Sequence, residues 1–471
     1  MSSDSRRVGV NTIFNTIGGF SIQLLTIATG VFVARHLGAE NFGQLTLAAT
    51  ITGYLTLLTE FGLSTIAIRT VARTGEPERY IYSYLVTRLA LALLALSALC
   101  GIILIVGFAQ ETVWLLLAYA STIPLQILKV NWLFYATQNM FLDNVIQVGE
   151  KLVYAGCLFS LVFVIKGAIL VPIAMAISIL AIAVLSWMLF LRISKRPLIW
   201  KLDRRFIREM FTQGWPIGVA GAALQTNSNV DSIFVNAYHG DLQTGLYGAA
   251  YRLINATITA GTFFTNAVFP LSCKRYHEST STLKDLIEYS SKLLLLVIVP
   301  GVILLSVLNE EIIWIIFGKE YSGSALPFRM LVWAAGIAII CRLYHNTLVA
   351  CEQQHKFMKI ILSTACFNVI CNFALIPTYG MQGAAAATIM TELLLLVLTC
   401  FTLSRLLNMR IWLNIATVTA CGGLASLVFL LPVSNLGVIP LFAIGYLVLT
   451  FIFRLWGLRE WQLVRTMLGR T

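Results

Sequence analysis

Charged residues are scarce in this chain. Asp, Glu, Lys and Arg make up 11% of the 471 residues, whereas 58% are hydrophobic. A soluble domain carries about 25% charged residues, so the composition excludes an ordinary water-soluble protein. The apolar runs 89–108, 168–191 and 411–431 contain few or no charges, and about 20 apolar residues suffice to cross a bilayer as a helix. The sequence therefore predicts an integral membrane protein that crosses the bilayer many times.

Motifs for enzymatic chemistry are also missing. The chain has no P-loop, no zinc-ligand spacing and no Gly-x-Ser-x-Gly sequence, and its five histidines are scattered. Its nine cysteines lie within or beside the apolar runs, where they are expected to act as small packing residues. The predicted outside loops are short, which leaves little room for catalytic groups. We therefore predict a protein that is not an enzyme, with no catalytic residue, no metal and no cofactor.

Strand-type alternation is absent, so an outer-membrane barrel is not expected. We predict an all-α polytopic fold with about 14 transmembrane helices. Residues 1–192 would form an N-terminal six-helix lobe and residues 214–405 a second one. Residues 193–213 would form a cytoplasmic amphipathic linker, and residues 406–471 two extra transmembrane helices with a basic cytoplasmic tail.

Lysine and arginine, which give a net charge of +12, cluster in the gaps between apolar runs. This placement is typical of cytoplasmic loops and argues against nucleic acid as a partner. It predicts that both termini are cytoplasmic. In the linker, Leu202, Phe206, Ile207 and Met210 alternate with arginines, which favours either an interfacial helix on anionic membrane lipids or an ordinary basic loop.

The two predicted lobes resemble each other weakly. Gly38 and Gly43 follow the first predicted span, and Gly240 and Gly245 follow the seventh with the same five-residue step. This match fits a six-plus-six internal repeat. Parallel repeats of this kind are typical of transporters.

Ionisable residues inside spans are costly and are therefore candidate functional residues. Basic ones outnumber acidic ones. Asp231 and Arg252 lie at similar predicted depths on neighbouring spans, so they form either a structural ion pair or a site in which Arg252 meets an anion. Polar residues on spans one and seven favour a hydrophilic cavity wall, with interhelical hydrogen bonding as the alternative. These cavity candidates are Asn11, Asn15, Gln23, Gln225, Asn227 and Asn229.

Short motifs along the chain resemble those of one transporter family. In order, they are Ala34 to Gly38 with Phe42-Gly43, Asn131-Trp132, Gly245 to Tyr247, Ala249 to Leu253, Phe317 to Tyr321, and Gly383 to Ala386. Over roughly residues 8–405, the chain resembles the polysaccharide transporter family, which includes the O-antigen flippases. That family belongs to the multidrug/oligosaccharidyl-lipid/polysaccharide exporter superfamily. One departure is Glu60, where relatives often carry aspartate, although the charge is kept.

The resemblance implies two six-helix lobes around a central cavity that opens alternately to each side. It implies a flippase of a prokaryotic plasma membrane that moves an oligosaccharide on a polyprenyl diphosphate carrier. Arg252, Lys129, Arg342 and Arg88 would bind the diphosphate. Asp231, Glu60 and Glu392 would position these cations or carry coupling protons or sodium. A polysaccharide polymerase and chain-length proteins are possible partners.

Three other functions remain open at this point. A cation-coupled multidrug exporter of the same fold would prefer organic cations and would need an acidic cavity, so the basic interior counts against it. A membrane glycosyltransferase or O-antigen polymerase would need catalytic groups in a larger outside loop. A scaffold for polysaccharide assembly is a further alternative, although buried charges would then have no role.

Overall fold

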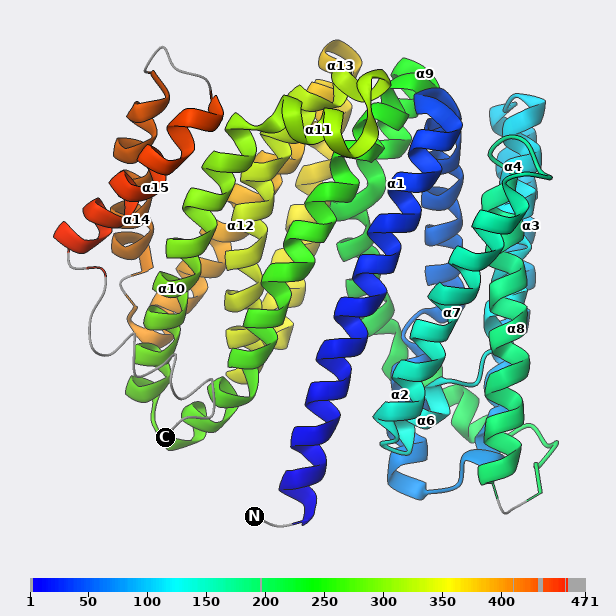
Figure 1. The fold of residues 1–471 in the computed structure, drawn as a ribbon. Coiled ribbons are helices and arrows are strands. Elements are labelled where there is room, and N and C mark those ends of the chain that lie inside the picture. Colours follow the sequence, from blue (N-terminus) through cyan, green and yellow to red (C-terminus); the bar gives the residue numbers. More distant parts are fainter. Residues whose placement is uncertain (1–2, 195–196, 410, 431–434, 454, 456–471) are drawn as a thin grey trace. The chain divides into compact units, whose positions relative to one another are not determined.

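The computed structural model describes residues 3–194, 197–409, 411–430, 435–453 and 455. This part of the chain folds into helices without a β-strand (Figure 1). Six of its helices are long and apolar enough to cross a bilayer, and shorter apolar helices follow at 415–426 and 438–452. The chain is thus an all-α, multi-pass membrane protein, as predicted. The number of crossings stays a prediction, as do the predicted lobe boundaries.

The chain divides into two compact units, residues 1–248 and 249–471. The first unit contains eight helices and the start of a ninth, α9 (Arg204–Glu278). These eight are α1 (Ser3–Glu60), α2 (Leu63–Thr74), α3 (Pro77–Val106), α4 (Gln110–Ala120), α5 (Thr122–Ile127), α6 (Trp132–Ala136), α7 (Met140–Leu161) and α8 (Leu170–Ile193).

The second unit contains the rest of α9 and the following helices. These are α10 (Thr280–Val307), α11 (Asn309–Phe317), the 3-10 helix η1 (Lys319–Ser324), α12 (Ala325–Ala350), α13 (Gln354–Leu407), α14 (Ile411–Ser426), η2 (Leu427–Leu430) and α15 (Asn435–Ile452). Inside α13, Asn372 donates to Asn368 at 2.9 Å and Asn368 donates to Thr391 at 3.1 Å. The bond between Asn368 and Thr391 joins the two parts of α13 on either side of its kink at Gly380, as buried amides do between membrane helices.

The two glycine pairs noted in the sequence adopt matching conformations. Helix α1 is kinked at Gly38, with φ 75°, and α9 is kinked at Gly240, with φ 77°. Five residues later, Gly43 and Gly245 lie against each other. A Cβ on Gly43 would overlap the carbonyl oxygen of Asp241, and a Cβ on Gly245 would overlap that of Ala39. Both contacts lie within the first unit, so the two stretches match in structure as well as in sequence.

The linker before α9 is held against the first turns of α3. Asp203 caps α9 by accepting from the backbone N–H groups of Arg205 and Phe206, each at 3.1 Å, which is the usual role of aspartate at a helix start. Arg79 on α3 donates to the same carboxylate at 3.1 Å. Phe206 and Met210 are buried in the hydrophobic core of the first unit. Leu202, on the same stretch, is 46% exposed, so contact of this segment with membrane lipid stays a prediction.

Candidate functional site

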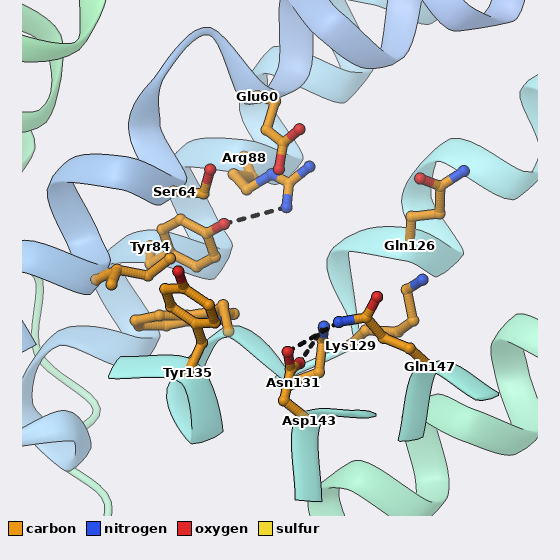
Figure 2. Close-up of a pocket in the computed structure, with 12 residues that line it drawn as sticks. Glu60, Ser64, Tyr84, Arg88, Gln126, Lys129, Asn131, Tyr135, Asp143 and Gln147 are labelled. Atoms are coloured by element: carbon orange, nitrogen blue, oxygen red, sulfur yellow. Dashed lines mark hydrogen bonds between the residues drawn. The ribbon is translucent and has the colours of Figure 1, made fainter. Parts of the chain in front are cut away.

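A polar cavity of about 330 Å³ lies within the first unit. Residues of α1, α2, α3, α5, α6 and α7 line it, together with the turn between α5 and α6. Three predicted site residues, Glu60, Arg88 and Lys129, meet there (Figure 2). The other lining residues are Ser64, Ile68, Tyr84, Gln126, Asn131, Trp132, Tyr135, Asp143 and Gln147. The cavity thus contains both cations and acids within an otherwise apolar membrane fold.

A break in the helical segment 110–136 positions Lys129. The structure divides this segment into α4, α5 and α6, and Lys129 lies in the turn before α6. The indole N–H of Trp187 donates to the carbonyl of Leu128 at 2.8 Å. The hydroxyl of Ser186 accepts from the backbone N–H of Val130 at 3.4 Å. A membrane helix can be interrupted only where other groups satisfy its backbone, so α8 supports the turn that carries the cation.

Lys129 forms an ion pair with Glu150 on α7. Its Nζ lies 2.9 Å from Oε2 and 3.2 Å from Oε1, and each side chain is 19% exposed. Glu150 is not among the site residues predicted from the sequence. No helical spacing links position 129 to position 150, so the pairing depends on the tertiary fold.

Arg88 is anchored at the end of α1. Its Nε donates to the carbonyl of Thr59 at 3.4 Å and its Nη1 donates to the hydroxyl of Tyr84 at 3.1 Å. The side chain is 7% exposed. A cation is favoured beside the C-terminal end of a helix, where carbonyl groups are unsatisfied. Among the described residues these are its two hydrogen bonds, so part of the five-donor guanidinium is left for a ligand.

Asp143 is the centre of a second polar group in the cavity. Its buried carboxylate accepts from Asn131 at 3.4 Å and from Gln147 at 2.8 Å (Figure 2). Asp143, Gln147 and Tyr84 are not among the site residues predicted from the sequence. The four-residue spacing of Asp143 and Gln147 on α7 is the one sequence signal that could have placed two of them on a shared helix face.

Asp231 on α9 is fully buried, and its carboxylate accepts from the hydroxyl of Tyr247 at 2.8 Å. The sequence did not suggest this partner. Asp231 belongs to the first unit and Arg252 to the second, so their pairing stays a prediction.

The predicted cavity-wall residues are distributed along α1 and α9. Asn227 is buried, while Gln23, Gln225 and Asn229 are half-buried. The amide of Asn229 donates to the carbonyl of Gln225 at 3.5 Å. The side chains of Asn11 and Asn15 lie outside the described residues. Their shared role as a cavity wall stays a prediction.

The remaining predicted site residues lie in the second unit. Arg252 is half-buried on α9, within electrostatic range of the buried Tyr321. Arg342 is exposed on α12, within electrostatic range of Glu392 on α13. Oε2 of Glu392 is buried and has no hydrogen-bond partner in the described part of the chain. Roles for these three residues stay predictions.

Comparisons with known proteins agree with this fold. A protein of Haloferax volcanii named as a probable low-salt glycan biosynthesis flippase is 23% identical over 92% of this chain and 92% of its own length. A protein of Escherichia coli named as a candidate O-antigen transporter is 19% identical over 84% of this chain and 96% of its own length.

Solved structures share the architecture. The lipid II flippase MurJ in an inward closed conformation matches with a TM-score of 0.74 and 15% identity, over 94% of this chain and 98% of that one. An outward-facing multidrug resistance transporter of the MATE family, in the MOP superfamily, matches with a TM-score of 0.59 and 14% identity, over 87% of this chain and 95% of that one. At such identities the likeness establishes the fold alone.

The family model described as polysaccharide biosynthesis protein matches residues 8–275, which is more than half of the chain. The matched segment contains α2 to α8 and nearly all of α1 and α9, and therefore every residue that lines the cavity. The resemblance drawn from short motifs and the helical membrane fold agree with this match. The chain belongs to the polysaccharide biosynthesis protein family.

Proposed function

We propose that this protein is a flippase that carries a polyprenyl-diphosphate-linked oligosaccharide across a prokaryotic plasma membrane by alternating access. The observation that carries the proposal is the cavity of the first unit, where Arg88 and Lys129 face a common space. Cations are expensive within a membrane and usually mark a substrate or ion pathway. The names of the Haloferax volcanii and Escherichia coli relatives support a lipid-linked glycan as the substrate class.

Arg88 is suited to hold the diphosphate. Its hydrogen bonds to Thr59 and Tyr84 fix the side chain and use only part of its donor set. A guanidinium fork can give two parallel hydrogen bonds to phosphate oxygens, which adds geometric specificity to charge attraction. The sugar would occupy the rest of the polar cavity while the polyprenyl chain stays in lipid.

Lys129 would take part by exchanging partners. Its ammonium is neutralised by Glu150. An arriving diphosphate would compete with Glu150 for the ammonium, so substrate binding would rearrange the contact between the turn before α6 and α7. Such an exchange gives a ligand different contacts in two states, as a population shift requires.

The same proposal covers the other predicted roles. The protein would move its substrate without a chemical step, with both termini in the cytoplasm. Arg252 and Arg342 would bind the diphosphate in the second unit, and Asp231, Glu60 and Glu392 would position cations or carry coupling protons or sodium. A polymerase and chain-length proteins would act on the delivered oligosaccharide.

The test is to delete the gene in its host and restore wild type, Arg88→Gln or a control variant, Arg192→Gln. Arg192 is exposed in the last turn of α8, outside the cavity. Polyprenyl-diphosphate lipids are extracted and surface polysaccharide is assayed. We expect complete oligosaccharide-lipid to accumulate in the deletion and Arg88→Gln strains, with loss of surface polymer, and Arg192→Gln to restore both.

Unchanged oligosaccharide-lipids in the deletion strain would overturn the proposal. If that strain instead became sensitive to cationic dyes, the protein would be a multidrug exporter of the same fold. Full activity of the double variant Arg88→Gln with Lys129→Gln would contradict a role for the cavity cations in transport.

A further inference from the structure

We propose that the part of this cavity formed by α6 and α7 is a binding site for the sugar ring attached directly to the diphosphate, and that Trp132, Tyr135, Asn131 and Gln147 select that sugar. This inference rests on the proposed flippase function and adds a recognition step to it. Figure 2 places Asn131, Asp143, Gln147 and Tyr135 around one part of the cavity and Arg88 with Glu60 around another.

The orientation of two amides follows from Asp143. An ionised carboxylate only accepts hydrogen bonds, so Asn131 and Gln147 must turn their NH₂ groups toward it. Their amide oxygens then point away from Asp143 and can accept from sugar hydroxyls. The buried carboxylate thus holds two amide oxygens in place as hydrogen-bond acceptors. Because these side chains are already ordered, binding a ligand does not have to pay the entropy cost of ordering them.

Trp132 supplies a donor without a partner. Its side chain is 7% exposed and lines the cavity, and its indole Nε1 has no hydrogen-bond partner among the described residues. A buried N–H left unsatisfied is destabilising, so a ligand that brings an acceptor to it would be favoured. A sugar hydroxyl both donates and accepts, and it can therefore satisfy this N–H and an amide oxygen together.

Aromatic surface completes the site. Trp132 packs on Tyr84 with ring centroids 4.5 Å apart, which holds its plane in place. Tyr135 is 46% exposed and lines the same cavity, so its ring is accessible to a ligand. A pyranose presents C–H groups on one face and hydroxyls at its edge, and an aromatic ring beside polar groups is suited to both.

The arrangement also orders the substrate. Tyr84 contacts Trp132, and its hydroxyl accepts from Arg88. The anion-binding guanidinium and the aromatic wall are therefore joined through one side chain. A diphosphate held by Arg88 would place its first sugar beside Trp132 and Tyr135.

The experiment measures binding to the full-length protein in lipid nanodiscs. The probes are a polyprenyl diphosphate without sugar and the same lipid carrying glucose, galactose, N-acetylglucosamine or N-acetylgalactosamine. We expect at least one sugar to raise the affinity of the wild type about tenfold or more over the sugar-free lipid. Trp132→Phe and, separately, Gln147→Leu should lose that gain while binding the sugar-free lipid within about twofold of wild type.

Trp114→Phe is the matched control, because Trp114 is exposed on α4 outside the cavity, and it should keep the gain. Thermal unfolding of each variant establishes that it is folded. The inference is overturned if no sugar raises wild-type affinity, or if both folded variants keep the gain. The proposed function fails separately if Arg88→Gln binds the sugar-free lipid as tightly as wild type, since that result concerns the anion and not the sugar.

Discussion

Gly43 and Gly245 lie where two helical stretches come closest to each other. A Cβ on either glycine would overlap backbone atoms of the stretch that contains the other glycine. Gly43 faces the carbonyl of Asp241 and Gly245 faces the carbonyl of Ala39. Because the obstructing atoms are backbone and not flexible side chains, neither position can admit a methyl group without moving a helix.

Gly245→Ala should therefore lower the free energy of unfolding by about 1–3 kcal/mol, the usual cost of overpacking. The control is Gly101→Ala on α3, where an added Cβ meets no atom within 4 Å and alanine favours the helix. Thermal unfolding in detergent measures both. Equal unfolding midpoints for the two variants would contradict this prediction, because they would show that the stretches containing Gly43 and Gly245 can move apart without loss of stability.

Glu150→Gln should leave Lys129 without its ionic partner. We expect a loss of stability of about 1.5–3 kcal/mol, typical for a hydrogen bond to a charged group. We also expect affinity for polyprenyl diphosphate to rise about tenfold, or ~1.4 kcal/mol, because the anion no longer competes with a carboxylate.

The double variant Lys129→Met with Glu150→Met is the control, since replacing both partners of a buried pair by apolar residues is often neutral. It should be more stable than Glu150→Gln and should bind the diphosphate less tightly. Unchanged diphosphate affinity in Glu150→Gln would contradict the exchange of partners at Lys129.

Arg88→Lys should lower flipping more than tenfold despite keeping the charge. A lysine cannot contact both the carbonyl of Thr59 and the hydroxyl of Tyr84 while presenting a planar fork to an anion. The rate is measured in proteoliposomes with a fluorescent lipid-linked sugar. Tyr84→Phe removes one anchor but keeps the fork and should be milder; equal losses in the two variants would contradict a bidentate role for Arg88.

Asp203→Asn should affect stability in a pH-dependent way. The backbone N–H of Phe206, aided by Arg79, holds the pKa of the Asp203 carboxyl below its usual value. The charge therefore stabilises the fold above the unfolded pKa of about 3.9, and this contribution is lost as pH falls through the lower, folded pKa. We expect a deficit of about 0.2–1 kcal/mol at neutral pH, as for surface pairs, which vanishes in acid. A constant deficit across pH would assign it to packing and not to charge.

Composition was sufficient to predict the helical membrane fold, because scarce charge and long apolar runs leave few other structures possible. The same reasoning singled out Glu60, Arg88 and Lys129, which lie far apart in the sequence but share one cavity. A charged residue inside a membrane span is costly wherever it occurs, so it can be recognised as a candidate functional residue without knowledge of its contacts.

The contacts between helices could not be predicted from composition or local sequence patterns. The break that exposes Lys129 depends on Trp187 and Ser186 of α8, which no local pattern connects to position 129. Asp143 and Tyr84 look ordinary in sequence and become site residues only through their neighbours. The apolar face of 202–210 has helical spacing, but spacing alone cannot distinguish lipid from a protein core.

The reciprocal glycine contact has the form of an isologous interface, in which the same patch of surface is used on both sides of the contact. In a two-fold dimer every substitution in such an interface is made twice. Here the two sides are separate positions, Gly43 and Gly245, on one chain. Each side can therefore be altered alone, so the two glycine stretches can keep a symmetric contact while the residues around each of them diverge.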